Sequence, residues 1–191
     1  MARFDAVALT TPRFLLQPVR PLGFARATLP WTEQRDAFAN LGWRRSRWTL
    51  WRWWQHLRRY SRRGRILHGI WPRSGGPCIG LHIIEVSAPS LTASLSVFIA
   101  DPAWRGRGVV PELRQAIFAD CFGRMGLQRV WTQVHARNAA AVRNQQKLGL
   151  VHEGTLRSTG LGADGQRTDT MIFGLLRAEW LARQKHMEIS V

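Results

Sequence analysis

A strand-forming run passes through a glycine-rich loop directly into a helix between residues 93 and 125. Residues 93–100 alternate in the manner of a strand, and residues 111–125 carry apolar side chains at helical spacing. Pro111 in the first turn and Glu112 near the positive end of the dipole favour a helix start here. A strand joined to a helix by so short a loop is typical of an α/β domain.

The remaining pattern predicts strands before this unit and further strand and helix units after it. Opening strands are expected at 13–19, 66–71 and 78–86, with residues 23–30 as a loop; a helix is expected from Thr32 through 33–36, another over 50–64 and a third at 138–149; later strands are expected at 127–134, 150–157 and 167–176. With 191 residues, the chain is expected to form a single α/β domain with a mixed, mostly antiparallel sheet flanked by helices.

Tryptophan and arginine are concentrated between residues 37 and 84, where the sequence has no acidic residue. The aromatic and basic residues of this stretch include Trp43, Trp48, Trp51, Trp53, Trp54 and Trp71, with Arg44, Arg45, Arg47, Arg52, Arg58, Arg59, Arg62, Arg63, Arg65 and Arg73. Such a surface could stack on and neutralise nucleic acid. Leu50, Trp53 and Leu57 recur at helical spacing, however, which favours an amphipathic helix that packs its tryptophans on a sheet.

The charge balance points to anionic partners. Lys and Arg total 28 against 12 Asp and Glu, giving a formal net charge of +16, and only two of the basic residues are lysine. A field of this sign attracts phosphate-bearing partners such as RNA, the ribosome or an anionic membrane. An arginine-biased composition on solvated faces would give the same count, so both explanations stay open.

Several protein classes are disfavoured by the sequence. The uncharged stretch 86–100 is too short for a membrane-spanning helix and is interrupted by Pro89 and serines, so no membrane association is expected. The first residues lack the apolar segment of a secretion signal. Cys78 and Cys121 form neither a disulfide framework nor a metal-binding pattern, so we expect a cytoplasmic protein without a metal cofactor.

The loop from Arg105 to Val110 has the chemistry of an anion site. Its glycines let a phosphate approach backbone N–H groups at a positive helix end, while Arg105 and Arg107 add charge. The Gly-x-x-x-x-Gly-Lys-Ser/Thr pattern is absent, and Pro111 stands where a dinucleotide fingerprint has its third glycine. A pyrophosphate loop remains, with a merely structural tight turn as the alternative.

These residues resemble the GNAT acetyltransferase superfamily. Arg105-x-x-Gly108 looks like its Arg/Gln-x-x-Gly-x-Gly/Ala loop, and residues 138–150 are similar to its Asn-x-x-Ser…Lys-Leu-Gly-Phe segment. Segments 11–18, 153–157, 164–169 and 175–180 resemble the ribosomal-protein N-terminal (alanine/serine) acetyltransferase branch. The resemblance is strong over 93–180, the expected coenzyme A-binding core, and weak over 21–64, the variable Trp/Arg-rich helical region expected on the acceptor side.

The resemblance implies that acetyl-coenzyme A is the cosubstrate. Its thioester and pantetheine arm would meet backbone groups of Phe98 and Ala100, and Asn138 would contact the coenzyme from the start of its helix. Its pyrophosphate would meet the loop formed by Arg105, Gly106, Arg107, Gly108, Val109 and Val110. The sequence departs from the family pattern at Leu95, Val110, Pro111 and Gln145, the last where many relatives have a tyrosine that protonates the leaving thiolate.

The implied activity is transfer of an acetyl group to a primary amine, either a protein N-terminal α-amine or a small amine. Glu85 and His135 are the candidate general bases. An α-amine has a pKa of ~7.7–8.0 against ~10.4 for lysine, so sparse basic groups favour an α-amine. The alternative is a catalytically weak module of the same fold that binds RNA or the ribosome through its Trp/Arg-rich region. Either form is expected to be a monomer or a homodimer.

Overall fold

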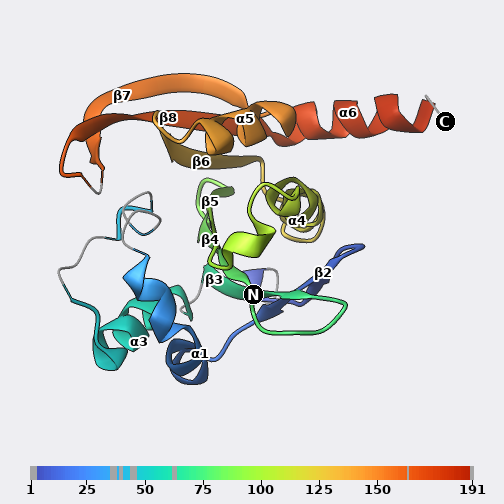
Figure 1. Ribbon diagram of the computed structural model, residues 1–191. Coiled ribbons are helices and arrows are strands. Elements are labelled where there is room, and N and C mark those ends of the chain that lie inside the picture. Colours follow the sequence, from blue (N-terminus) through green and yellow to red (C-terminus); the bar gives the residue numbers. More distant parts are fainter. Residues whose placement is uncertain are drawn as a thin grey trace.

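The computed structural model describes residues 4–34, 38, 41–43, 47–61, 64–162 and 164–189. These residues form one eight-stranded sheet in the order β1-β2-β3-β4-β5-β6-β8-β7 (Figure 1). The strands are β1 (Leu9–Thr10), β2 (Phe14–Pro18), β3 (Arg65–Pro72), β4 (Gly80–Ser87), β5 (Thr92–Ile99), β6 (Arg129–His135), β7 (Val151–Leu161) and β8 (Arg167–Leu176). Neighbouring strands are antiparallel except β5 and β6, which are parallel. The expected α/β domain with a mixed, mostly antiparallel sheet is confirmed.

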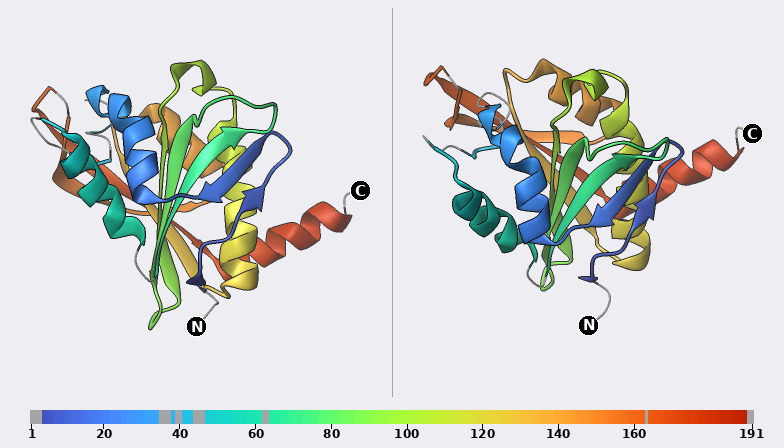
Figure 2. Two further views of the ribbon diagram at one scale, coloured as in Figure 1. Left: turned by 90° about the horizontal axis from the view of Figure 1, so that it is seen from below. Right: turned by 60° about the horizontal axis from the view of Figure 1, so that its bottom comes forward.

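Helices cover both faces of this sheet (Figure 2). The α-helices are α1 (Pro21–Thr28), α3 (Leu50–Arg58), α4 (Val109–Ala119), α5 (Ala139–Lys147) and α6 (Arg177–Ile189). Helices α1 and α3 lie on one face and α4 lies on the other, while α6 projects away from the body of the molecule. The sheet is therefore the middle layer between two separate apolar cores.

The core beneath α4 is built mainly from aliphatic side chains. Leu113 and Ile117 of α4 are fully buried, and they belong to one cluster with Ile84 and Leu95 of the sheet. Because successive side chains of a strand point to opposite faces, the alternation of β3 to β5 supplies this core and the opposite one at once. His68 and His82 also lie buried in the sheet, and burial lowers the pKa of both.

The core beneath α1 and α3 is aromatic. Trp53 is fully buried and its Nε1 donates to Thr28 Oγ1 at 2.9 Å, which ties α3 to α1. The ring of Phe38 meets those of Trp53 and Phe98 at centroid distances of 5.4 and 5.2 Å. Most of the tryptophan stripe is therefore packing surface, as its helical spacing favours, whereas Trp51 is 60 % exposed.

Two sequence-based expectations before α3 are wrong. Residues 23–30, expected as a loop, contain most of α1, which begins at Pro21 because proline is pre-organised for the first helical position. Thr32 does not cap a helix; it lies inside a 3₁₀ turn, Leu29–Glu33, and its Oγ1 donates to the Leu29 carbonyl. Part of the expected helix start, residues 35 and 36, lies outside the described residues.

Other boundaries differ by a few residues for local reasons. Helix α3 ends at Arg58 and continues as a 3₁₀ turn, Arg59–Ser61, so Gly64, with a φ of +76°, leads into β3 rather than stopping the helix. Helix α4 begins two residues before Pro111 and ends in a π turn, Asp120–Arg124. The cap at Asn138 is confirmed: its Oδ1 accepts from the Ala141 N–H at 3.1 Å.

Among the described residues, no helix is both long enough and apolar enough to cross a bilayer.

Replacing the buried tryptophan of α3 tests whether the aromatic region is packing surface. Trp53→Ala should lower the free energy of unfolding by about 3–5 kcal/mol, because it opens a cavity in the core and leaves Thr28 without its donor. The exposed neighbour provides the matched control: Trp51→Ala should change stability by no more than about 0.5 kcal/mol. Urea denaturation followed by far-ultraviolet circular dichroism measures both, and equal losses would contradict the assignment.

Candidate functional site

The sheet opens between its two parallel strands. The β5–β6 register runs from Thr92–Arg129 to Ser94–Trp131 and then ends. At the next level Thr132 Oγ1 donates to the Leu95 carbonyl at 2.8 Å, so a side chain replaces the backbone ladder where the strands part. A cavity of roughly 650 Å³ occupies the gap, lined by β5, β6, the loop before α4 and helix α5.

The loop at the mouth of this cavity presents unpaired backbone donors. Gly106 and Gly108 both have φ values near the left-handed region's centre, +73° and +72°, which only glycine adopts without strain. Gly108 is the N-cap of α4, so the first N–H groups of the helix lack intrahelical acceptors. Within the described residues, the N–H groups of Gly106 to Val110 have no hydrogen-bond acceptor. They form the donor set that an anion requires at a helix N-terminus.

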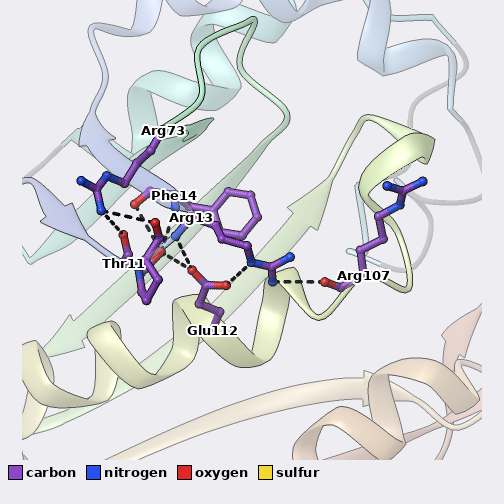
Figure 3. Close-up of polar contacts among 7 residues, drawn as sticks. Thr11, Arg13, Phe14, Arg73, Arg107 and Glu112 are labelled. Atoms are coloured by element: carbon purple, nitrogen blue, oxygen red, sulfur yellow. Dashed lines mark hydrogen bonds and ion pairs between the residues drawn. The ribbon is translucent and has the colours of Figure 1, made fainter.

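A partly exposed ion pair between Arg13 and Glu112 fixes this loop to the start of β2 (Figure 3). Glu112 in the first turn of α4 accepts from Arg13 Nε at 2.6 Å, from the Arg13 N–H at 2.8 Å and from Thr11 Oγ1 at 2.7 Å. Arg13 Nη2 also donates to the Arg107 carbonyl at 3.1 Å. The same arginine therefore holds both the helix start and the loop that precedes it.

The carboxyl group of Glu112 stays ionised in this setting. Burial acts to raise its pKa, but the hydrogen bonds from Thr11 and Arg13 and the arginine's charge outweigh that effect and lower the pKa below its usual value. The negative charge also lies near the positive end of the α4 dipole.

Arg105 holds the loop from the other side. Its Nε donates to the Ile99 carbonyl at 3.0 Å and its Nη2 to the Ala100 carbonyl at 3.1 Å and to Gln34. Its guanidinium is thus committed to the end of β5, although the residue lines the cavity. Arg107 is exposed and is not among the residues that line the cavity.

The expected backbone contacts on β5 are wrong by one residue. The Ala100 N–H donates to the Ile79 carbonyl at 2.8 Å, and hydrogen-bonded pairs alternate along an antiparallel ladder. The Ala100 N–H and, two residues earlier, the backbone groups of Phe98 therefore point toward β4, although Phe98 is among the residues that line the cavity. The Ala100 carbonyl accepts from Gln34 and Arg105. The backbone of Val97 faces the cavity instead.

The two candidate bases occupy different places. His135 ends β6 and lines the cavity. Glu85 does not line it: the residue pairs with Ser94 below the point where the strands part, and its carboxylate forms an ion pair with Arg65 Nε at 3.0 Å. Asn138 also lines the cavity, where its side chain caps α5.

The cavity is strongly electropositive. Its lining contains four cationic residues, Arg105, Arg114, Arg143 and Lys147, and no carboxylate. Arg114, which is 2 % exposed, belongs to none of the motifs that the sequence displays. The sequence feature that could have indicated Arg114 is the presence of a charged residue within the buried stripe of α4, between Leu113 and Ile117. Among the described residues the lining offers no cluster of metal-ligating side chains.

Comparison with known proteins identifies this architecture. Residues 13–151 match the family model described as an acetyltransferase (GNAT) domain. The spermidine N-acetyltransferase from Vibrio cholerae, solved with CoA and spermine, superposes with a TM-score of 0.78 at 17 % identity, over 88 % of this chain and 98 % of that one. A GNAT-family acetyltransferase from Bacillus anthracis gives 0.75 at 15 % identity, over 91 % of this chain and 100 % of that one. At these identities the structures establish the fold.

Removing the charge of Glu112 tests whether the ion pair supports the anion loop. Glu112→Gln should lower the free energy of unfolding by about 1–3 kcal/mol and weaken coenzyme A binding several-fold, because Arg13 loses the partner that holds it against the loop. The folded-state pKa of Glu112 is depressed, so its contribution is present above the unfolded pKa of about 4.3 and is lost as the pH falls through the folded value. The stability gap between wild type and variant should therefore close in acid.

An ion pair remote from the loop controls for a general effect of lost charge. Glu153 on β7 accepts a hydrogen bond from Arg129 Nη2 on β6 at 2.6 Å, across the intervening strand β8. This arginine also lowers the pKa of Glu153. Glu153→Gln should leave coenzyme A affinity unchanged in titration calorimetry. An equal loss of affinity in both variants would show that the Glu112 pair has no specific part in the loop.

Proposed function

Because the chain belongs to the acetyltransferase (GNAT) domain family and is an acetyl-coenzyme A-dependent N-acetyltransferase, we propose that it acetylates an α-amine at a protein N-terminus, or a small amine of equally low pKa. The observation that carries this proposal is the cavity between β5 and β6, with unpaired N–H groups at its mouth and no carboxylate in its lining. Such a site suits an anionic carrier and an uncharged amine.

The hydrogen-bond donors of the cavity define how acetyl-coenzyme A would lie in it. The N–H groups of Gly106 to Val110 bind the pyrophosphate, and Asn138 contacts the coenzyme from the start of α5. The pantetheine arm extends along the free edge of β5, where Val97 offers the backbone groups that β6 no longer pairs. A backbone N–H at this edge also polarises the thioester carbonyl, an interaction typically worth ~2.7–4 kcal/mol in the transition state.

His135 is the base that the cavity contains. Its imidazole accepts the proton from the amine as the nitrogen attacks the thioester carbon. The task is modest for an α-amine, because at pH 7 its deprotonation costs only ~1 kcal/mol, against ~4.6 kcal/mol for lysine. The surrounding cations lower the pKa of an acceptor amine further.

The charge of the cavity argues against a polyamine acceptor. The Vibrio cholerae enzyme was solved with spermine, a polycation. Recognition of several ammonium groups calls for carboxylates, yet this cavity's lining has none and residues 37–84 contain no acidic residue. An N-terminus followed by acidic residues, or an amine that carries phosphate, matches the field better.

The segment at 21–64 forms the acceptor side in this proposal, and residues 93–180 form the coenzyme-binding core. Trp31 and Phe98 meet edge-to-face at 6.0 Å beneath α1, and Leu41 reaches the cavity lining. The resemblance to the ribosomal-protein N-terminal branch supports a protein N-terminus as acceptor. A basic ribosomal tail, however, would be repelled by a chain of net charge +16 unless RNA lies between them.

A second function, docking to RNA or the ribosome, is supported by the outer face of α3. Trp51 is exposed, its ring lies 4.6 Å from that of Trp54, and the guanidinium of Arg58 lies 4.9 Å from the Trp54 ring centroid. Neighbouring aromatic and cationic groups of this kind suit single-stranded nucleic acid, whose bases stack on aromatic side chains. The two functions are compatible, because this face is separate from the cavity lining.

A charged side chain in the anion loop should separate these functions. Gly108→Glu places a carboxylate among the N–H donors. It also puts a side chain at a position whose φ is +72°, which only glycine adopts without strain. Acetyl-coenzyme A at 100 times its Kd should stabilise the wild type by about 2.7 kcal/mol and should leave the variant's melting temperature unchanged. Any RNA affinity, measured by its salt dependence, should survive in the variant.

Gly165, with a φ of +78° in the turn between β7 and β8, provides the control. Gly165→Glu adds the same charge and a similar backbone penalty far from the loop, so the coenzyme should still raise its melting temperature. Loss of the thermal shift in both variants would refute the assignment of the loop.

An acceptor panel tests the substrate class. At pH 7, peptides with a free α-amine and acidic second and third residues should be acetylated on the order of 10²-fold faster than N-blocked lysine peptides or spermidine, because a far larger fraction of their amines is neutral. Thiol release measures the rates. His135→Gln should reduce kcat for the α-amine peptide and flatten the acid limb of its pH–rate profile.

The panel has clear negative outcomes. A preference for spermidine or for lysine side chains at pH 7 would overturn the proposed acceptor class. An unchanged pH–rate profile in His135→Gln would remove that residue from the mechanism while leaving the acceptor assignment intact.

A further inference from the structure

One buried cation in the cavity has no counter-charge. Arg114 on α4 is 2 % exposed, and its only hydrogen bond among the described residues runs from Nη2 to the Leu95 carbonyl at 3.4 Å. Its Nε and Nη1 are buried without any partner. A guanidinium removed from water with donors to spare is costly unless a ligand completes its contacts.

The groups around Arg114 do not supply that charge. His82 faces it from β4, and burial together with this arginine's charge lowers the pKa of His82 well below its usual value, so the ring is neutral. Cys121 lies in the π turn that follows α4. Burial raises its pKa to about 12, so it is a neutral thiol. The other titratable groups of the cavity are His135 and the cations Arg105, Arg143 and Lys147. Burial lowers the pKa of Arg114 itself to about 10, which leaves it cationic at neutral pH.

Arg114 lies where the coenzyme's sulfur would end. Its hydrogen bond to Leu95 places the guanidinium at the vertex of the gap, one residue beyond the last β5–β6 pair at Ser94. From Leu95 to Ala100, at the loop end of β5, an extended strand covers about 17 Å. An extended pantetheine arm whose pyrophosphate lies on the loop can span this depth.

A second unpartnered group lies in the same cavity. Gln145 on α5 is 3 % exposed and its Oε1 has no hydrogen-bond donor. An amide is a poor proton donor to a departing thiolate. This chain therefore needs another way to stabilise the leaving group.

We propose that Arg114 is a catalytic residue that stabilises the coenzyme A thiolate as it leaves the acetyl group. The inference rests on the proposed acetyl transfer and adds the group that receives the negative charge. The amine nitrogen's lone pair forms the C–N bond, and the C–S bonding pair departs on sulfur beside the guanidinium. The proton lost by nitrogen passes through His135 to water, and the thiolate takes up a proton from water on release.

The binary complex with coenzyme A tests this without any acceptor. Calorimetric titrations compare coenzyme A with desulfo-coenzyme A from pH 6 to 10, so that only the sulfur differs. If Arg114 stabilises the thiolate, the bound thiol's pKa falls by at least about one unit. The affinity ratio of the two ligands should then rise about tenfold as the pH increases from the bound to the free thiol pKa, and level off above it.

Variants of Arg114 assign the effect to this side chain. Arg114→Met keeps the length and removes the charge; it should abolish the pH dependence of the ratio and reduce kcat at least tenfold with little change in KM. Its melting temperature should equal or exceed that of the wild type, because an unpaired buried charge is lost. Arg114→Lys should retain part of the shift. Arg143→Met, which removes an exposed cation from the rim, should leave most of the ratio's pH dependence in place.

Two results would overturn the inference. One is a wild-type ratio that does not vary with pH; the other is a ratio that rises equally in wild type and Arg114→Met. Failure of the acceptor proposal is a separate result, since a thiol pKa shifted by Arg114 in the binary complex holds whichever amine is acetylated.

Discussion

The parting of β5 and β6 is the constraint on which the rest of the molecule depends. Buried backbone N–H and C=O groups must find partners, and two parallel strands that separate after Ser94–Trp131 leave one edge of each unpaired. Thr132 satisfies the first free carbonyl, at Leu95, and beyond it the edges face a cavity rather than each other. A ligand with its own amide groups completes such an edge in the way that a neighbouring strand would. The interrupted ladder thus creates the cavity that we propose as the binding site.

How the loop is held explains why a glycine-rich segment can be a well-defined anion site. The glycines supply the left-handed conformations that aim the N–H groups outward, but they also make the segment intrinsically mobile. Arg13 and Arg105 counter this from opposite sides, one through Glu112 and the Arg107 carbonyl, the other through the carbonyls at the end of β5. Both arginines are therefore structural cations, and the proposed phosphate contacts fall to the backbone.

The sequence was a good guide to local pattern and a poor one to backbone direction. The cap at Asn138, the strand–loop–helix unit and the packing of Trp53 follow from short-range chemistry, and the structure confirms them. The backbone contacts expected at Phe98 and Ala100 failed because the ladder's alternation is set by the register with β4, which no local signal encodes. Helix α1 was missed because its glycine and the prolines at its start and just beyond its end suggest a loop. Burial of Phe24 and Ala25 against the aromatic core nevertheless stabilises a helix.

The electropositive cavity links the donor and the acceptor halves of the chemistry. The cavity's four cations and its lack of a carboxylate favour an anionic carrier, and in the proposed reaction Arg114 stabilises the departing thiolate; both effects grow as water is excluded. The same field opposes an ammonium ion, so the acceptor must enter as the neutral amine or bring negative charge with it. An α-amine meets that condition near neutral pH, whereas a lysine side chain or a polyamine meets it only at a cost that this cavity has no anionic group to offset. Under the proposed function, acceptor selectivity therefore follows from the same charges that favour an anionic donor.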